Sequence, residues 1–358
     1  MKDSKPRYAT IDALRGLAAL GVFLSHLMTN EMFGEAIRET IPGFILRLCH
    51  HGNFGVQVFF VISGFVIALS LSQRPLTRSG AFNFMLRREL RLNPPYAVAL
   101  LGAAALKASF GQPFPDLGTI AINLFYLQGI LGVPEILGVA WTLCIEVQFY
   151  LAFLLLLALD RWLGKPGEAP ISQVGVTLMW VTAVISCLLV QIGTPWQIAT
   201  YAPYTWFYFA IGALCFWCWR GWAPVWTLGV VMLGLTCSAL WGILTPGDSY
   251  VSASFEGIET GLITALSIFY LAGRGKLETL SLGKIGQFLG RISYSLYLTH
   301  AISANSGFWL AQKIWGLTNT GALMGIALGL VWAFILAEIF HRAIERPSMI
   351  VASKFKMA

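Results

Sequence analysis

Charged residues are scarce in this chain of 358 residues. They make up 11% of the sequence, hydrophobic residues make up 57%, and the mean hydropathy is +0.70. A soluble domain of ordinary composition carries about 25% charged residues, so the scarcity excludes a protein of that kind. The composition predicts an all-α polytopic membrane protein, a bundle of transmembrane helices embedded in a lipid bilayer.

Basic blocks interleaved with aromatic residues, the pattern of a nucleic-acid surface, are also lacking. The net charge is +7 and the pI is about 9.2, but lysine and arginine lie in short segments between apolar runs. The basic excess therefore indicates asymmetric loops of a membrane protein, with no nucleic acid as a partner.

Cysteines with partnering histidines at metal-ligand spacing are missing as well. Cys215 and Cys218 have CxxC spacing, yet they lie among aromatic residues. Small buried hydrophobic side chains are the simpler interpretation, and we predict no metal. The first apolar run shows no small-residue cleavage site before Glu31, so we expect it to stay in the protein.

Ten apolar stretches are long enough to cross a membrane, at about 20 residues each. They are residues 10–30, 53–72, 93–110, 138–159, 173–192, 201–219, 224–243, 257–273, 292–311 and 321–341. The segment 118–131 is apolar but short, and we interpret it as re-entrant or interfacial on the outer side. If this segment were instead a true span, the orientation of every later helix in the membrane would be inverted.

The basic residues predict the orientation of these ten helices. Arg15 lies inside the first helix, nineteen other lysines and arginines fall on one side, and four fall on the opposite side: Arg38, Arg47, Lys107 and Lys313. Cytoplasmic loops carry such an excess, so both termini are predicted to be cytoplasmic. We find no internal repeat, which argues against a transporter built from symmetric halves.

The first stretch carries an arginine and a histidine, and ionisable residues are costly at membrane depth and therefore suggest function. Arg15 and His26 are eleven residues apart, almost three helical turns, so both project from one face about 16 Å apart. The alternative is that Arg15 reaches the headgroups and pairs with Asp12, while His26 is a satisfied interior histidine.

The segment 73–92 is the most basic part of the chain, and we predict a cytoplasmic loop. Arg88 and Arg91 are spaced i, i+3 and share one side of a helical turn, with Arg87 alongside. Guanidinium groups suit phosphates, although a loop that touches anionic lipid is the alternative. Asn93, Pro94 and Pro95 are expected to separate this loop from the third helix.

Two later helices carry polar groups inside apolar sequence. Glu146 lies a turn and a half into the string WTLCIEVQFYLAF, close to Tyr150, and needs a donor or a watery cavity. Tyr294, Tyr297 and His300 follow at three-residue steps on one helix face. Structural pairing is an alternative to catalysis for both groups.

Five motifs together resemble the acyltransferase-3 family of membrane proteins, from about Thr10 to Pro347. They are DALRGLAALGVFLSH with its arginine and histidine, the Arg88/Arg91 pair, the WTLCIEVQFY string, ISYSLYLTH, and ERP at Glu345 to Pro347. Val147 stands where the family often has a second acidic residue, so only Glu146 carries over. Near the last motif, Glu338 is expected to pair with Arg342.

The resemblance implies an O-acyltransferase of the bacterial inner membrane, with residues 1–358 forming one transmembrane domain and no appended hydrolase-like domain. Acetyl-coenzyme A is expected as the donor, with its phosphates on Arg87, Arg88 and Arg91, and a carbohydrate or glycolipid as the acceptor. His26, Arg15 and Glu146 are the predicted catalytic residues, with Tyr150, Tyr294, Tyr297 and His300 in support. His26 would act as a general base or as an acyl relay. The rival is a polysaccharide or lipid transporter.

Overall fold

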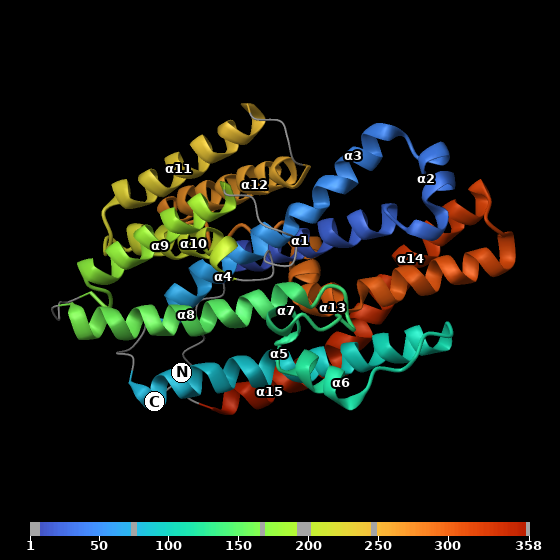
Figure 1. The fold of residues 1–358 in the computed structure, drawn as a ribbon, viewed down its shortest axis with the longest axis horizontal. Coiled ribbons are helices and arrows are strands. Elements are labelled where there is room, and N and C mark those ends of the chain that lie inside the picture. The colour runs from blue at the N-terminus through green and yellow to red at the C-terminus, as the bar shows by residue number, and fades with distance from the viewer. Residues whose placement is uncertain (1–7, 73–76, 165–168, 192–201, 245–248, 356–358) are drawn as a thin grey trace.

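The computed structural model describes residues 8–72, 77–164, 169–191, 202–244 and 249–355, and these contain helices and no strand. Figure 1 shows the helices running largely along the longest axis of the molecule. Their bounds are α1 Ala9–Met28, α2 Gly34–Thr40, α3 Gly43–His51, α4 Gly55–Leu71, α5 Arg78–Ser109, α6 Leu117–Leu124, α7 Gln128–Leu131, α8 Trp141–Leu163, α9 Gln173–Gln191, α10 Trp206–Trp219, α11 Val225–Leu244, α12 Ser249–Gly273, α13 Gly283–Trp315, α14 Asn319–Phe340 and α15 Arg346–Lys354.

Side-chain caps begin several of these helices. The hydroxyl of Thr77 accepts from the Gly80 backbone N–H at the start of α5, and Asp116 accepts from the Thr119 N–H at the start of α6. Thr318 caps α14 in the same way. Each cap satisfies a backbone donor that has no partner inside its helix.

Four helical stretches among the described residues are long and apolar enough to cross a membrane. They are Ala9–Met28, Gly43–Leu71, Trp141–Leu163 and Asn319–Lys354. Each of the ten predicted stretches coincides with a helix, but within the described residues only these four meet both limits, so ten crossings and cytoplasmic termini stay predictions. Six of the basic residues counted for orientation lie outside the described residues: Lys2, Lys5, Arg7, Arg74, Lys165 and Lys356.

The prediction of a loop over 73–92, ended by Asn93, Pro94 and Pro95, was wrong. Helix α5 begins at Arg78 and continues through both prolines to Ser109. Proline removes two backbone donors there, but tertiary hydrogen bonds hold the segment. The hydroxyl of Tyr294 donates to the Leu92 carbonyl at 2.8 Å, and the Asn93 amide donates to the Leu124 carbonyl at 3.1 Å.

The segment 118–131 forms two short helices, α6 and α7, and neither is long enough to span a bilayer. Tyr126 interrupts them with a left-handed backbone conformation at φ 58°. The two helices lead the chain from the end of α5 back to the start of α8 (Figure 1). This agrees with the prediction of a short segment that is not a full crossing.

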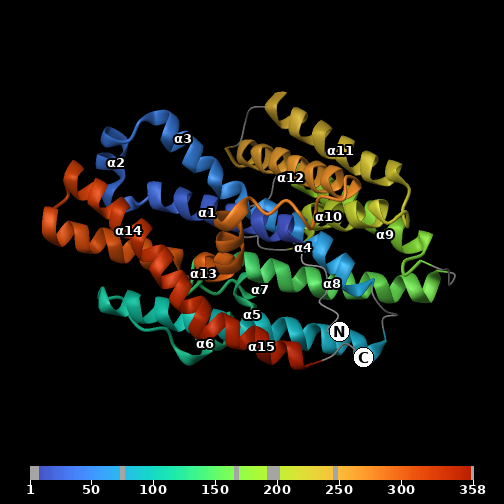
Figure 2. The same ribbon diagram turned by 180° about the vertical axis from the view of Figure 1, so that it is seen from behind.

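Helix α1 lies in the interior of the bundle, against α4 on one side and α13 on the other. Figure 2 shows the group α9 to α12 at one end of the molecule, while α5 runs beside α15 along an edge. Five helices (α1, α4, α5, α8 and α13) surround the space in which the polar residues meet.

Glycine allows α4 and α10 to approach very closely. A Cβ on Gly64 would clash with the backbone carbonyl of Phe209, and one on Gly212 would clash with the carbonyl of Val61. Gly55 is packed as tightly against the Ala18 carbonyl of α1. Gly55 and Gly64 therefore allow close helix packing, and small residues at helix interfaces serve this purpose in membranes.

We expect Gly64→Ala to lower the free energy of unfolding of the purified protein by about 1–3 kcal/mol, because the added methyl group forces α4 and α10 apart. Gly229→Ala is the matched control, since a Cβ there meets no atom within 4 Å. Thermal unfolding in detergent measures both variants. Equal unfolding temperatures for the two would contradict the packing argument.

Candidate active site

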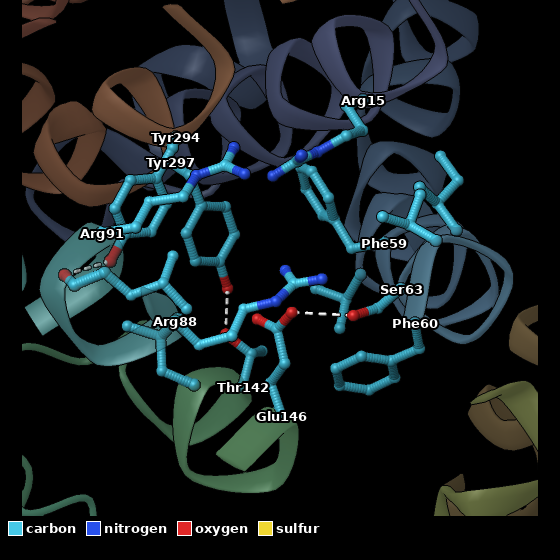
Figure 3. A pocket seen from close by; sticks show the side chains of 15 residues that line it. Arg15, Phe59, Phe60, Ser63, Arg88, Arg91, Thr142, Glu146, Tyr294 and Tyr297 are labelled. Carbon is cyan, nitrogen blue, oxygen red and sulfur yellow. Dashed lines mark hydrogen bonds between the residues drawn. The ribbon is translucent and has the colours of Figure 1, made fainter. Parts of the chain in front are cut away.

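A cavity lined by both charged and apolar side chains lies between α1, α4, α5, α8 and α13. Figure 3 shows the side chains of Arg15, Arg88 and Arg91 pointing into it, with Glu146 opposite. Apolar side chains of α4, including Phe59, complete the wall. Charged groups from three helices that are far apart in sequence therefore converge on one space.

The three guanidinium groups make no ion pair within 4 Å in the described part of the chain, although the Glu146 carboxylate shares their cavity. Among the described residues, none of Arg15, Arg88 and Arg91 makes a hydrogen bond or ion pair, and all three are partly buried. The guanidinium of Arg88 is held over the rings of Tyr150 and Phe84, at 5.2 and 5.4 Å from their centres. Unpaired cations that share a cavity are costly, so this arrangement favours an anionic ligand.

Glu146 is satisfied by hydroxyl groups. Its Oε1 atom accepts from Ser63 of α4 at 2.8 Å and from Tyr150 one turn along α8. Figure 3 shows the carboxylate close to the Arg88 side chain, on the floor of the cavity. In this structure Glu146 contacts Ser63 and Tyr150, whereas His26 contacts His300.

Tyrosines of α13 form the opposite wall. The hydroxyl of Tyr297 is 2.8 Å from the Thr142 hydroxyl of α8, and its ring contacts Phe59 edge-on. Tyr294 donates to the Leu92 carbonyl of α5. The two tyrosines thus join α13 to α8 and α5 across the cavity.

A second groove meets the cavity at Val66, Arg88 and Arg91, which line both spaces. It is also lined by Arg87 of α5 and by Ser353 of α15. It lies where α5 begins and α15 ends, the end predicted to be cytoplasmic. Arg88 and Arg91 therefore line both spaces, and Arg87 lines the groove.

His26 does not line the cavity and pairs instead with His300. The Nδ1 atom of His26 is 2.7 Å from Nε2 of His300. His300 is completely buried, whereas His26 is exposed. His300 lies one turn of α13 beyond Tyr297, so the histidine pair sits just past the tyrosine wall of the cavity.

The carboxy-terminal motif is structural in this arrangement. Glu345 is buried and accepts from Ser295 at 2.6 Å, and its carboxylate is 3.0 Å from Nδ1 of His341. The predicted pair of Glu338 with Arg342 is confirmed, at 2.6 Å, and Arg291 joins it at 3.0 Å. These contacts anchor the π-helical turn His341–Glu345 to α13.

Two site residues were missed by sequence reasoning. No site role was predicted for Ser63, which bonds the cavity carboxylate, or for Thr142, which contacts the Tyr297 hydroxyl. A hydroxyl residue in an apolar helix is too common to indicate a partner. Only the spatial neighbour on another helix reveals what each one does.

We expect Glu146→Ala to destabilise the protein by about 1–3 kcal/mol, because the Ser63 and Tyr150 hydroxyls lose their acceptor in a partly buried site. Glu146→Gln should cost less, since its amide oxygen still accepts one of these bonds. Thermal unfolding of the purified variants checks the order. A Glu146→Ala protein as stable as the wild type would contradict it.

The sequence was also compared with known protein families and proteins. Residues 8–340 match the family described as "Acyltransferase domain", acyltransferase-3, which is nearly the whole chain. The chain belongs to the acyltransferase-3 family. It is therefore an acyltransferase of the kind that transfers groups other than amino-acyl groups, and its apolar helices indicate a membrane protein.

Relatives of this acyltransferase carry related names. It is 25% identical to "Acyltransferase MdmB" of Streptomyces mycarofaciens, over 96% of this chain and 92% of that protein. It is 26% identical to "Exopolysaccharide production protein ExoZ" of Rhizobium meliloti, over 78% and 88%. It is 28% identical to "Peptidoglycan O-acetyltransferase OatA" of Listeria monocytogenes, over 50% of this chain and 30% of that protein. No solved structure matches.

The family assignment decides between the two classes of function considered from the sequence. An acyltransferase needs an acyl donor, and a path lined by unpaired arginines suits an anionic one. A polysaccharide or lipid transporter transfers no acyl group and therefore needs no site for an acyl donor.

Proposed function

We propose that this acyltransferase is an O-acetyltransferase of the bacterial inner membrane that moves an acetyl group from cytoplasmic acetyl-coenzyme A to a hydroxyl of an envelope or exported carbohydrate. The convergence of three unpaired guanidinium groups on the path from groove to cavity carries the proposal. Coenzyme A is rich in phosphate, and its thioester lies at the end of a narrow, extended arm.

The donor side of the reaction is assigned to the groove and the cavity. Arg87, Arg88 and Arg91 hold the phosphates where the two spaces meet, because guanidinium groups bind phosphate oxygens in pairs without losing their charge. Arg15, further along the cavity, attracts the polar part of the arm. The thioester then points along the bundle toward the turn of α13 that carries His300.

The transfer step is assigned to His26, which lies beyond the cavity. Its imidazole takes the proton from the acceptor hydroxyl as the oxygen attacks the thioester carbonyl. The new carbon–oxygen bond forms, the carbon–sulfur bond breaks, and the departing thiolate receives the proton from the imidazolium. The ester product and coenzyme A leave the enzyme in its starting protonation state.

Names of relatives support the acceptor class. One relative is named for peptidoglycan O-acetylation and another for exopolysaccharide production. Both names concern carbohydrate polymers of the bacterial envelope or exterior. We infer the same broad class of acceptor here, a carbohydrate or a glycolipid that presents a sugar hydroxyl.

Membrane vesicles test this function. Inverted inner-membrane vesicles that contain the protein should incorporate labelled acetate from acetyl-coenzyme A into carbohydrate, and mild alkali should release it as expected of an ester. Right-side-out vesicles hide the donor site from added donor and should incorporate much less. No incorporation above that of vesicles lacking the protein would overturn the proposal.

A further inference from the structure

His300 is held in one orientation by its own helix. Its Nδ1 atom is 2.8 Å from the backbone carbonyl oxygen of Tyr297, one turn earlier in α13. A carbonyl oxygen can only accept a hydrogen bond, so Nδ1 of His300 must carry the proton. In neutral His300 the other ring nitrogen, Nε2, then has a free lone pair.

That lone pair faces His26. The Nε2 atom of His300 is 2.7 Å from Nδ1 of His26, within the range of a strong hydrogen bond. The ring centres are 5.0 Å apart and the ring planes differ by only 24°. These values arise when the two nitrogen atoms lie near the line between the ring centres, so the bond runs in the ring planes, where a lone pair points.

The hydrogen bond fixes the proton on His26 as well. Because Nε2 of His300 can only accept, Nδ1 of His26 must donate, and neutral His26 keeps its lone pair on Nε2. The Nδ1–H group also stays bonded after Nε2 takes up a proton, and a hydrogen bond from a charged donor is stronger than one from a neutral donor.

We propose that His300 is a positioning residue that holds His26 as the Nδ1–H tautomer and leaves its Nε2 atom free to accept the proton of the acceptor hydroxyl. The hydrogen-bonded series of Tyr297 carbonyl, His300 and His26 fixes the tautomer and orientation of the His26 imidazole, which is one of the two roles of the carboxylate in a Ser-His-Asp triad. The buried position of His300 keeps water from competing for the bond. The inference rests on the proposed role of His26 as the base.

The tautomer can be measured directly in the wild-type protein. The chain has five histidines, and nitrogen NMR of protein labelled on histidine distinguishes protonated from unprotonated ring nitrogens. Signals of His26 are assigned by their loss in His26→Gln. The expected result is a protonated Nδ1 and an unprotonated Nε2 on His26. A proton on Nε2 in the neutral wild-type protein would overturn the inference.

Two variants at position 300 separate positioning from packing. His300→Gln keeps an oxygen that can accept from Nδ1 of His26, whereas His300→Leu has similar bulk and no acceptor. We expect His300→Gln to keep the tautomer and kcat within about fivefold of the wild type. We expect His300→Leu to move the His26 proton toward Nε2 and to lower kcat by about a hundredfold, with an unchanged KM for the donor.

The NMR measurement and the kinetics of the two His300 variants also distinguish this inference from the proposed function. If the protein transfers no acetyl group, the tautomer of wild-type His26 still confirms or overturns the arrangement. If transfer occurs and His300→Leu, shown to be folded by thermal unfolding, matches wild-type kcat, the positioning role is wrong while the proposed function stands.

Discussion

Replacing His26 by alanine is expected to abolish acetyl transfer while leaving the protein inserted in the membrane and folded. Loss of a general base lowers the rate by about 10²–10⁴-fold. His26 is exposed at its position in α1, so the truncation leaves no large void in the core. Incorporation of labelled acetate into the carbohydrate of inverted vesicles measures the loss.

His50→Ala is the matched control for that variant. His50 is an exposed histidine at the end of α3, and it is tied to α1 by its backbone carbonyl, which accepts from Ser25 at 3.4 Å. Its side chain is therefore expendable, and transfer should continue at the wild-type rate. Appreciable turnover by His26→Ala at a wild-type level of protein would rule His26 out as the base.

The double variant Arg88→Ala/Arg91→Ala is expected to weaken the donor site far more than the acceptor site. A hydrogen bond to a charged group contributes about 1.5–3 kcal/mol, so two lost phosphate contacts should raise the KM for acetyl-coenzyme A by at least about a hundredfold. The KM for the carbohydrate acceptor should change little. Initial rates at varied donor and acceptor concentrations measure both constants.

Arg274→Ala/Lys276→Ala removes the same number of positive charges from an exposed stretch after α12. This pair is also predicted to be cytoplasmic, but it lines neither the cavity nor the groove. A donor KM that rises equally in both double variants would show a general attraction between charges. A rise of donor and acceptor KM together in Arg88→Ala/Arg91→Ala would contradict a donor site there.

The sequence predicted the helices better than their ends. Long apolar runs specify a spanning helix by length alone, so α1, α4, α8 and α14 lie where the periodicity and hydropathy put them. Helix α5 was misjudged because proline is a strong local signal. Tyr294 and Asn93 bond this part of α5 to α13 and to the Leu124 carbonyl, and a local rule cannot see a contact across 200 residues.

The members of the site could be predicted, but their partners could not. Arg15, Arg88, Arg91 and Glu146 stand out because charges are rare in this chain, and they do converge on one cavity. Spacing along a helix says which face a residue occupies and nothing about the helix opposite. That is why the contact of Glu146 with Ser63 and the contact of His26 with His300 emerged only in three dimensions.

Binding of acetyl-coenzyme A to the purified protein tests the central claim most directly. Titration calorimetry in detergent needs no acceptor, and adenosine 3′,5′-bisphosphate serves as a competitor that carries phosphates without the thioester arm. The account predicts saturable binding that the bisphosphate reduces and that Arg88→Ala/Arg91→Ala loses. A folded wild-type protein that does not bind acetyl-coenzyme A would contradict it.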